Sequence, residues 1–155
     1  MISNRRPSER ILLVAAVILG IFVAASAVLG YHASGNPKFC MSCHSMKEIG
    51  KQWRQSTHKQ FACVECHLPD DFLVAQVAFK TRSGLNDLYH ETLRSYPAAF
   101  RISENGRRVV RGNCLRCHAS TIENTPMARS GGDCVKCHRY LVHGRGAGEG
   151  GISVE

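Results

Sequence analysis

One short motif, two cysteines separated by two residues and followed at once by a histidine, occurs four times in this chain of 155 residues. The copies are Cys40-Met41-Ser42-Cys43-His44, Cys63-Val64-Glu65-Cys66-His67, Cys114-Leu115-Arg116-Cys117-His118 and Cys134-Val135-Lys136-Cys137-His138. This arrangement is the attachment signature of a c-type haem: the thiols form thioethers to the porphyrin, and the histidine is held under the iron. The copies use all eight cysteines. The sequence therefore predicts four covalent haems c.

The main alternative for these cysteines is a pair of zinc sites, each with four thiolate ligands. A histidine directly after all four cysteine pairs has no role in such sites and would rarely arise by chance. No cysteine is left over for a disulfide bond. Haem attachment of this kind takes place outside the cytoplasm, so the haem-bearing part of the chain is expected to cross a membrane.

The formal net charge of +8 has a simple explanation in this context. Basic chains often bind nucleic acid or anionic membranes. Four haems, however, bring about eight propionate carboxylates, which the surplus lysines and arginines can largely neutralise. The chain contains no nucleic-acid-binding motif, and we expect no nucleic-acid partner.

The N-terminal region predicts a membrane anchor. Residues 11–30 contain no charge, and twenty predominantly apolar residues span the hydrocarbon core as one helix. Arg5, Arg6 and Arg10 precede them and place the N-terminus in the cytoplasm. The alternative is a cleaved signal peptide with Ala25-Ser26-Ala27 as its cleavage site. We predict a retained, single-pass anchor in the bacterial cytoplasmic (inner) membrane, with the haem domain on the periplasmic side.

The predicted fold is mainly α with little regular structure: one transmembrane helix followed by a compact multihaem domain organised around four haems. We expect the cytoplasmic N-terminus and anchor in residues 1–34, the tetrahaem domain in 35–145 and a flexible glycine-rich tail in 146–155. Aromatic residues make up only 7% of the chain, which suits a domain whose core is built from porphyrins. The motifs form two close pairs around a central insert, a loose internal duplication.

The insert, from Asp70 to about Tyr96, is the clearest helix outside the anchor, with Asp70 or Asp71 as its cap. A turn is expected at Asn105-Gly106. Along the insert, an apolar stripe predicts the packing face and a polar stripe lies beside it. The first is Val74, Val77, Thr81, Leu85 and Leu88, and the second is Lys80, Gly84, Asp87 and Glu91. The polar stripe is either a solvated face or a pocket in which Gly84 lets a flat ring approach the backbone.

Four histidines outside the motifs are candidates for the sixth position at iron. His58 and His143 lie next to haem motifs and are predicted to be ligands. His32 reads as an interfacial residue, and His90, on the insert helix, as a packed or surface residue. Met46, two residues after His44, could replace His44 on the same face of the first haem.

The single anchor, the spacing of the four motifs and the methionine of C-x-x-C-H-x-M together resemble the NapC/NirT family of membrane-anchored quinol dehydrogenases. The resemblance covers residues from about 10 to 145 and is greatest for the small quinol-oxidising subunits of cytochrome c nitrite reductases. It implies that Met46, not His44, ligates haem 1. It implies that His67, His118 and His138 are the proximal ligands of haems 2, 3 and 4.

The same resemblance implies that His58 and His143 are the distal ligands of the second haem pair. It implies that a lysine of a catalytic partner completes haem 2. Lys80 and Asp87 match the lysine and aspartate of the family's quinol pocket beside haem 1. In that pocket we expect Asp87 to accept the proton of the quinol and Lys80 to hold a quinol oxygen.

The expected function is oxidation of menaquinol by a quinol dehydrogenase that passes electrons to a periplasmic, ammonia-forming multihaem nitrite reductase. Three alternatives stay open. The chain could feed another periplasmic reductase, it could be a soluble electron-shuttle cytochrome released by cleavage after Ala27, or it could reduce nitrite or hydroxylamine by itself.

Overall fold

The computed structural model describes residues 6–96 and 100–144, apart from the side chains of residues 129 and 130. The tail expected at 146–155 lies outside the described residues. The chain divides after Ser34 into two units, which are described separately. All regular structure in the described residues is helical, which confirms the mainly α fold.

The first unit is one uninterrupted helix, α1, Pro7–Ala33. Its 27 residues correspond to a length of about 40 Å, more than the roughly 30 Å of a bilayer's hydrocarbon core. The helix is long and apolar enough to cross a membrane, and none of its side chains is buried. It also runs without a break through residues 25–27, the site considered for signal-peptide cleavage.

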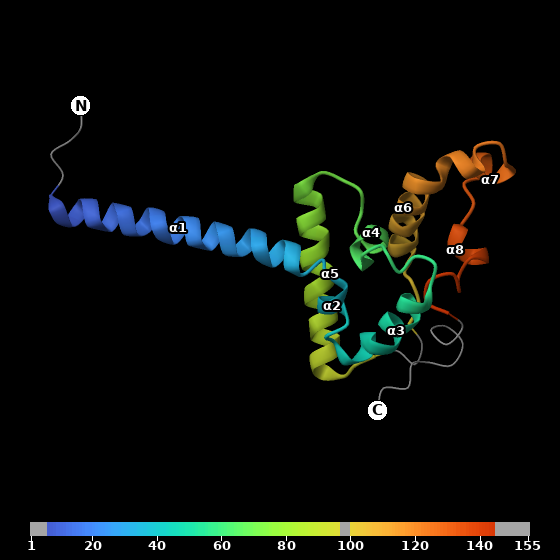
Figure 1. Ribbon diagram of the computed structural model, residues 1–155, viewed down its shortest axis with the longest axis horizontal. Helices are drawn as coiled ribbons and strands as arrows, with labels where there is room; N and C mark the ends of the chain where they lie inside the picture. Colours follow the sequence, from blue (N-terminus) through green and yellow to red (C-terminus); the bar gives the residue numbers. More distant parts are fainter. Residues whose placement is uncertain (1–5, 97–99, 145–155) are drawn as a thin grey trace. The chain divides into compact units, whose positions relative to one another are not determined.

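The second unit consists of short helices connected by turns, with two longer helices, α5 and α6 (Figure 1). In chain order they are α2 Pro37–Cys40, the 3₁₀ helix η1 His44–Met46, α3 Lys47–Gln55, α4 Cys63–His67, α5 Leu73–Leu93, α6 Glu104–Ile122, α7 Pro126–Ser130 and α8 Cys134–Cys137. Helix α6 is the scaffold of the C-terminal half, because α4, α7 and α8 all pack against it.

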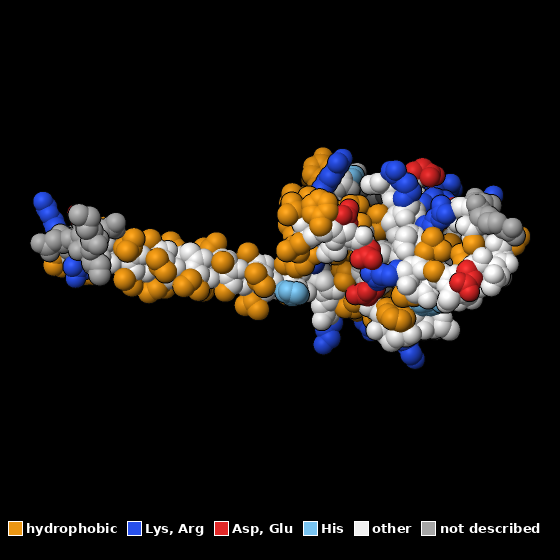
Figure 2. Space-filling model, turned by 90° about the horizontal axis from the view of Figure 1, so that it is seen from above, with side chains coloured by type: hydrophobic (Ala, Val, Ile, Leu, Met, Phe, Trp, Pro, Cys, Tyr) orange, Lys and Arg blue, Asp and Glu red, His pale blue; other side chains and the backbone are white. Residues whose placement is uncertain are grey.

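The described part of this unit has almost no hydrophobic core of its own. Val110, in α6, is the one hydrophobic residue classed as buried, and the buried polar residues are Ser45 and Asn113. Figure 2 shows apolar side chains spread over the surface of the domain. A domain of this size needs a buried apolar interior to be stable. The protein atoms do not supply one, which fits a fold whose interior consists of porphyrins.

The apolar stripe expected to pack α5 is exposed in this structure. Val74 is 71% exposed, and Leu85 and Leu88 are 62% and 59% exposed. The periodicity correctly predicts a helix, but no described part of the protein covers this stripe. The predicted packing of the stripe against the chain is therefore wrong.

The ends of α5 also differ from the expected range of 70–96. The helix α5 begins at Leu73 and its N-cap residue is Phe72, so the prediction that Asp70 or Asp71 caps it is wrong. The Asp71 carboxylate instead accepts a hydrogen bond from the backbone N–H of Phe72 at 2.7 Å, one residue before the helix. The helix ends at Leu93 because Arg94 adopts the left-handed conformation, with φ 49°.

The turn expected at Asn105-Gly106 is instead the first turn of α6. The hydroxyl of Ser103 accepts a hydrogen bond from the backbone N–H of Gly106 at 3.1 Å and caps this helix. An N-cap serine outweighs the turn preference of an Asn-Gly pair when the residues that follow can continue a helix.

Candidate functional site

The four motifs are neighbours in the same order in space as in the sequence. The Cys63 thiol donates a hydrogen bond to Cys40, which lowers the pKa of Cys40 to about 7 and raises that of Cys63. This contact joins motif 1 to motif 2. Surrounding protein atoms raise the pKa of Cys114, and the nearby charges of Cys134 and Cys66 raise it further, so motif 3 lies close to motifs 4 and 2.

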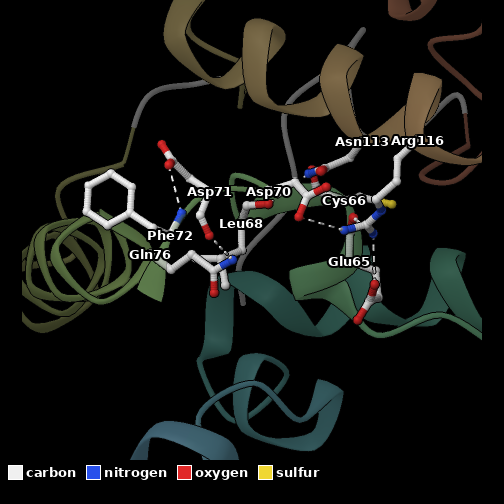
Figure 3. A network of polar contacts seen from close by, with 9 residues as sticks. All are labelled: Glu65, Cys66, Leu68, Asp70, Asp71, Phe72, Gln76, Asn113 and Arg116. Carbon is white, nitrogen blue, oxygen red and sulfur yellow. Dashed lines mark hydrogen bonds and ion pairs between the residues drawn. The ribbon is translucent and has the colours of Figure 1, made fainter. Parts of the chain in front are cut away.

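Polar contacts fix the second motif against the third (Figure 3). Arg116 lies inside motif 3, and its guanidinium donates to the Glu65 carboxylate inside motif 2 at 2.8 Å. The buried amide of Asn113 donates to the carbonyl oxygens of Cys66 and Leu68 at 2.9 and 2.8 Å. Glu65 and Arg116, which lie between the cysteines of their motifs, and Asn113, just before motif 3, therefore hold the two attachment sites together.

A similar contact fixes the fourth motif. Arg107 of α6 donates to the carboxylate of Asp133 at 2.6 Å. The other carboxylate oxygen of Asp133 accepts from the backbone N–H of Val135 at 3.2 Å and caps α8. Sequence reasoning missed these contacts, because nothing in the motif pattern indicates which basic and acidic residues meet.

Two pairs of histidine rings lie close together, at about the spacing that one metal ion between them requires. The ring centroids of His58 and His118 are 6.2 Å apart, and those of His67 and His143 are 6.0 Å apart. Metal–imidazole bonds are about 2 Å long, and each ring centroid lies about 1 Å beyond its nitrogen, so two axial rings are roughly 6 Å apart. These residues therefore fit two haems with histidine on both sides.

This geometry changes one expectation. His143 lies beside His67 of motif 2, not beside a histidine of the second haem pair, because the segment after α8 returns to motif 2. His143 is thus a candidate sixth ligand for a haem held by motif 2. His58 lies beside His118, as expected for the second pair.

The remaining histidines are placed differently. No histidine ring in the described part of the chain is paired with His138 of motif 4. Nδ1 of His90 lies 2.8 Å from the carbonyl oxygen of Ser95, so this ring helps to close the C-terminal end of α5. His32 lies in the last turn of α1.

The polar stripe of α5 lies near the first motif. Protein atoms around Lys80 lower its pKa, and the neighbouring Cys40 raises it. Asp87 is exposed, but the protein atoms around its carboxylate still raise its pKa. The nearby His90 and His67 partly oppose this increase. The Asp87 charge also acts on both cysteines of motif 1.

Gly84 lies between these two charged residues on the same face of α5. A Cβ atom added there would meet no other atom within 4 Å. There is open space between a lysine and an aspartate, beside the first haem attachment site. Such open space at an exposed glycine is compatible with both interpretations of the stripe, a solvated face and a pocket that admits a flat ring.

Glu91 completes the stripe and makes the direct contacts to motif 1. Its carboxylate accepts a hydrogen bond from the backbone N–H of His44 at 2.5 Å and one from the Ser45 hydroxyl at 2.7 Å. The sequence places Glu91 on this face, four residues after Asp87, but gives no indication of its partners.

The comparisons with known proteins agree with this description. The NapC/NirT cytochrome c family, N-terminal region, matches residues 3–147. The chain is 38% identical over 150 residues to the cytochrome c-type protein NrfH of Wolinella succinogenes, covering 86% of this chain and 84% of the relative. It is 29% identical over 143 residues to the cytochrome c nitrite reductase subunit NrfH of Nitratidesulfovibrio vulgaris, covering 92% and 89%.

A solved structure is also similar. It is the crystal structure of the cytochrome c nitrite reductase NrfHA complex bound to the inhibitor HQNO, with a TM-score of 0.74 and 30% identity. The match covers 86% of this chain and 91% of the solved chain. Four C-x-x-C-H motifs, an apolar N-terminal helix and these similarities over most of the sequence lead to one conclusion: the chain belongs to the NapC/NirT cytochrome c family.

Proposed function

We propose that this chain is the membrane-anchored tetrahaem subunit that oxidises menaquinol and delivers the electrons to a periplasmic, ammonia-forming nitrite reductase. The similarity to two nitrite reductase NrfH subunits and to the NrfHA complex supports the identity of the partner. One structural observation supports quinol oxidation most directly. Lys80 and Asp87 lie beside motif 1, at the start of a row of four haem attachment sites.

The proposed ligand set combines the two histidine pairs described above with what the family resemblance implies for Met46 and His138. The eight cysteines hold four haems c; His67 with His143 would ligate haem 2, and His118 with His58 would ligate haem 3. His138 would ligate haem 4, and Met46 would ligate haem 1 in place of His44. When bound, each haem supplies a centre that accepts and gives up one electron.

The chain's own residues would handle the protons. Oxidation of a quinol to a quinone releases two electrons and two protons. Asp87 accepts one proton from a quinol hydroxyl and, being exposed, can pass it to water before it accepts the second; its raised pKa brings this base closer to the working pH. Lys80 donates a hydrogen bond to a quinol oxygen, and the open space at Gly84 admits the ring. The two electrons leave through the row of haems.

Helix α1 would anchor this subunit in the bacterial cytoplasmic membrane. Its length suits a single crossing, and the arginines at its N-terminus favour a cytoplasmic start with the haem domain on the periplasmic side. The lipid bilayer is thus both the anchor's environment and the source of the apolar quinol.

The two histidine pairs can be tested separately. Replacement of His143 by alanine should convert haem 2 to a high-spin or five-coordinate state, because its iron loses the strong ligand opposite His67. His58→Ala should do the same to haem 3 through His118. Electron paramagnetic resonance of each variant should show the loss of one different low-spin signal, with four haems retained by mass. His90→Ala, which removes the contact to Ser95 but no member of either histidine pair, is the control.

Loss of the same signal in both variants would contradict this assignment. So would loss of a low-spin signal in His90→Ala with the haem content intact.

The reassigned ligands also move the expected contact with the partner to haem 4. With His143 beside His67, the described chain offers no histidine pair for the haems of motifs 1 and 4. Haem 1 is assigned to Met46 beside the quinol site, and haem 4 is the last in the row. A partner side chain, for which the family resemblance suggests a lysine, would then complete haem 4. Addition of the partner reductase should change the spectrum of haem 4 and leave those of haems 2 and 3 unaltered.

Purification from membranes, followed by identification of the co-purifying protein, tests the function as a whole. The proposal expects a multihaem nitrite reductase and nitrite-dependent oxidation of menaquinol by the complex. Recovery of a different reductase, or a spectral change confined to haem 2, would contradict it.

A further inference from the structure

The first haem motif has a different backbone conformation from the other three. Motif 2 lies within α4, motif 3 within α6, and the cysteine pair of motif 4 forms α8. In motif 1, the helix that holds Cys40 ends at that residue, and Cys43 is extended, with ψ 140°. A new 3₁₀ helix, η1, then begins at His44. His44 therefore does not continue a helical cysteine pair, as His67 and His118 do.

Glu91 of α5 holds this different conformation in place. One carboxylate oxygen accepts from the backbone N–H of His44, and the other accepts from the hydroxyl of Ser45. The two donors are consecutive residues, 47 and 46 positions away from Glu91 in the sequence, so the carboxylate fixes both the position and the orientation of the start of η1.

The environment of these groups agrees with a specific role. Ser45 is only 6% exposed, so its hydroxyl would be costly to leave without a partner. Within the segment that Glu91 holds, His44 is exposed and Met46 is half-buried. Motif 1 thus turns its histidine outward and keeps its methionine closer to the protein interior.

We propose that Glu91 is the positioning residue that selects Met46 over His44 as the iron ligand in the first haem motif. It acts by keeping Cys43 extended and η1 attached to α5, which directs the His44 side chain away from the position that the helical motifs give to their histidines. This inference rests on the ligand assignment in the proposed function. It adds that the selection depends on a residue of α5, the same helix that holds Lys80 and Asp87.

The main test is Glu91→Ala in the full-length holoprotein. Loss of both hydrogen bonds should release the backbone at His44, so the spectroscopic signature of methionine ligation at one haem should disappear and a new histidine-ligated signal should replace it. The potential of that haem should fall, because replacement of methionine by histidine lowers haem potentials. In Glu91→Ala combined with His44→Ala, the new signal should be absent.

Three further variants make the test specific. Ser45→Ala removes one of the two hydrogen bonds and Glu91→Gln keeps an amide oxygen as an acceptor, so each should produce a mixture of the two ligation states. Glu48→Ala is the control. It also removes a glutamate carboxylate, but one in an exposed ion pair with Lys51 at 3.7 Å, and it should leave haem 1 unchanged.

The outcomes separate this inference from the proposed function. If Met46→Leu leaves the spectrum of haem 1 unchanged, the ligand assignment itself is wrong. If Met46→Leu alters haem 1 but Glu91→Ala, with four haems attached, does not, only the role of Glu91 is wrong. If the Glu91→Ala protein fails to attach its first haem, the milder variants Ser45→Ala and Glu91→Gln provide the test. Wild-type spectra and potentials of haem 1 in both of them would overturn the inference.

Discussion

Replacement of Asp87 by asparagine is expected to slow menaquinol oxidation by roughly 10²–10⁴-fold, the usual effect of removing a general base. Asparagine keeps the shape of the side chain but cannot take up the proton. The four haems should stay attached with unchanged spectra, because Asp87 is neither a haem anchor nor an expected iron ligand. The measurement is single-turnover reduction of the haems by a menaquinol analogue.

The pH dependence provides a second measurement on the same variant. Asp87 acts as a base only when it is ionised, so the rate should fall as the pH falls through its pKa. Desolvation raises that pKa, and the fall should therefore begin at a higher pH than for an ordinary aspartate. This fall in rate at low pH, the acidic limb of the pH profile, should be missing in Asp87→Asn.

Asp70→Asn is the matched control. It removes the same charge from an exposed carboxylate, 3.9 Å from Arg116 and next to motif 2, and should retain wild-type turnover and the acidic limb. Wild-type turnover in Asp87→Asn would show that Asp87 is not the proton acceptor of the quinol site.

The second large effect is expected when the chain is made without haem. Because Val110 is the one hydrophobic residue classed as buried in the described residues, the protein atoms alone leave too little buried apolar surface to balance the conformational entropy of the chain. The haem-free domain should show no cooperative thermal transition by circular dichroism and should be digested rapidly by protease. The haem-loaded protein should unfold cooperatively.

A graded version of this experiment removes one haem. Cys114→Ala with Cys117→Ala should destabilise the C-terminal half most, because motif 3 lies within α6, against which α4, α7 and α8 pack. A cooperative transition of similar midpoint in the haem-free chain would show that the protein core is sufficient by itself.

The sequence predicts well those parts of the molecule that depend on local covalent chemistry. The four motifs define the haem attachment sites, and the uncharged run at 11–30 indicates a long apolar helix that the structure places at Pro7–Ala33. The helical period also predicts correctly that Lys80, Gly84, Asp87 and Glu91 share a face. Each of these inferences needs only neighbouring residues and the regular geometry of a helix.

The errors have a different cause. The apolar stripe of α5 was expected to pack against the chain, but in a haem protein much of the apolar interior is not amino acid. The distal-ligand prediction for His143 is not an error of this kind: its ring lies 6.0 Å from that of His67, which motivates the assignment to haem 2 proposed above. The contacts of Glu91 with His44 and Ser45 join residues far apart in the sequence, and no periodic pattern reports such a pairing.

The pairing of His67 with His143 has a consequence for the order in which the protein matures. The residues that follow the anchor cross the membrane first, so motif 2 emerges early, yet the ring beside His67 belongs to one of the last residues of the domain to emerge. If His143 ligates haem 2, that iron waits, with one side open, until nearly the whole domain has crossed the membrane. The sixth ligand of haem 2 would then be added only when export is nearly complete, and a chain cut short after motif 4 would keep all four porphyrins but leave this iron without that ligand.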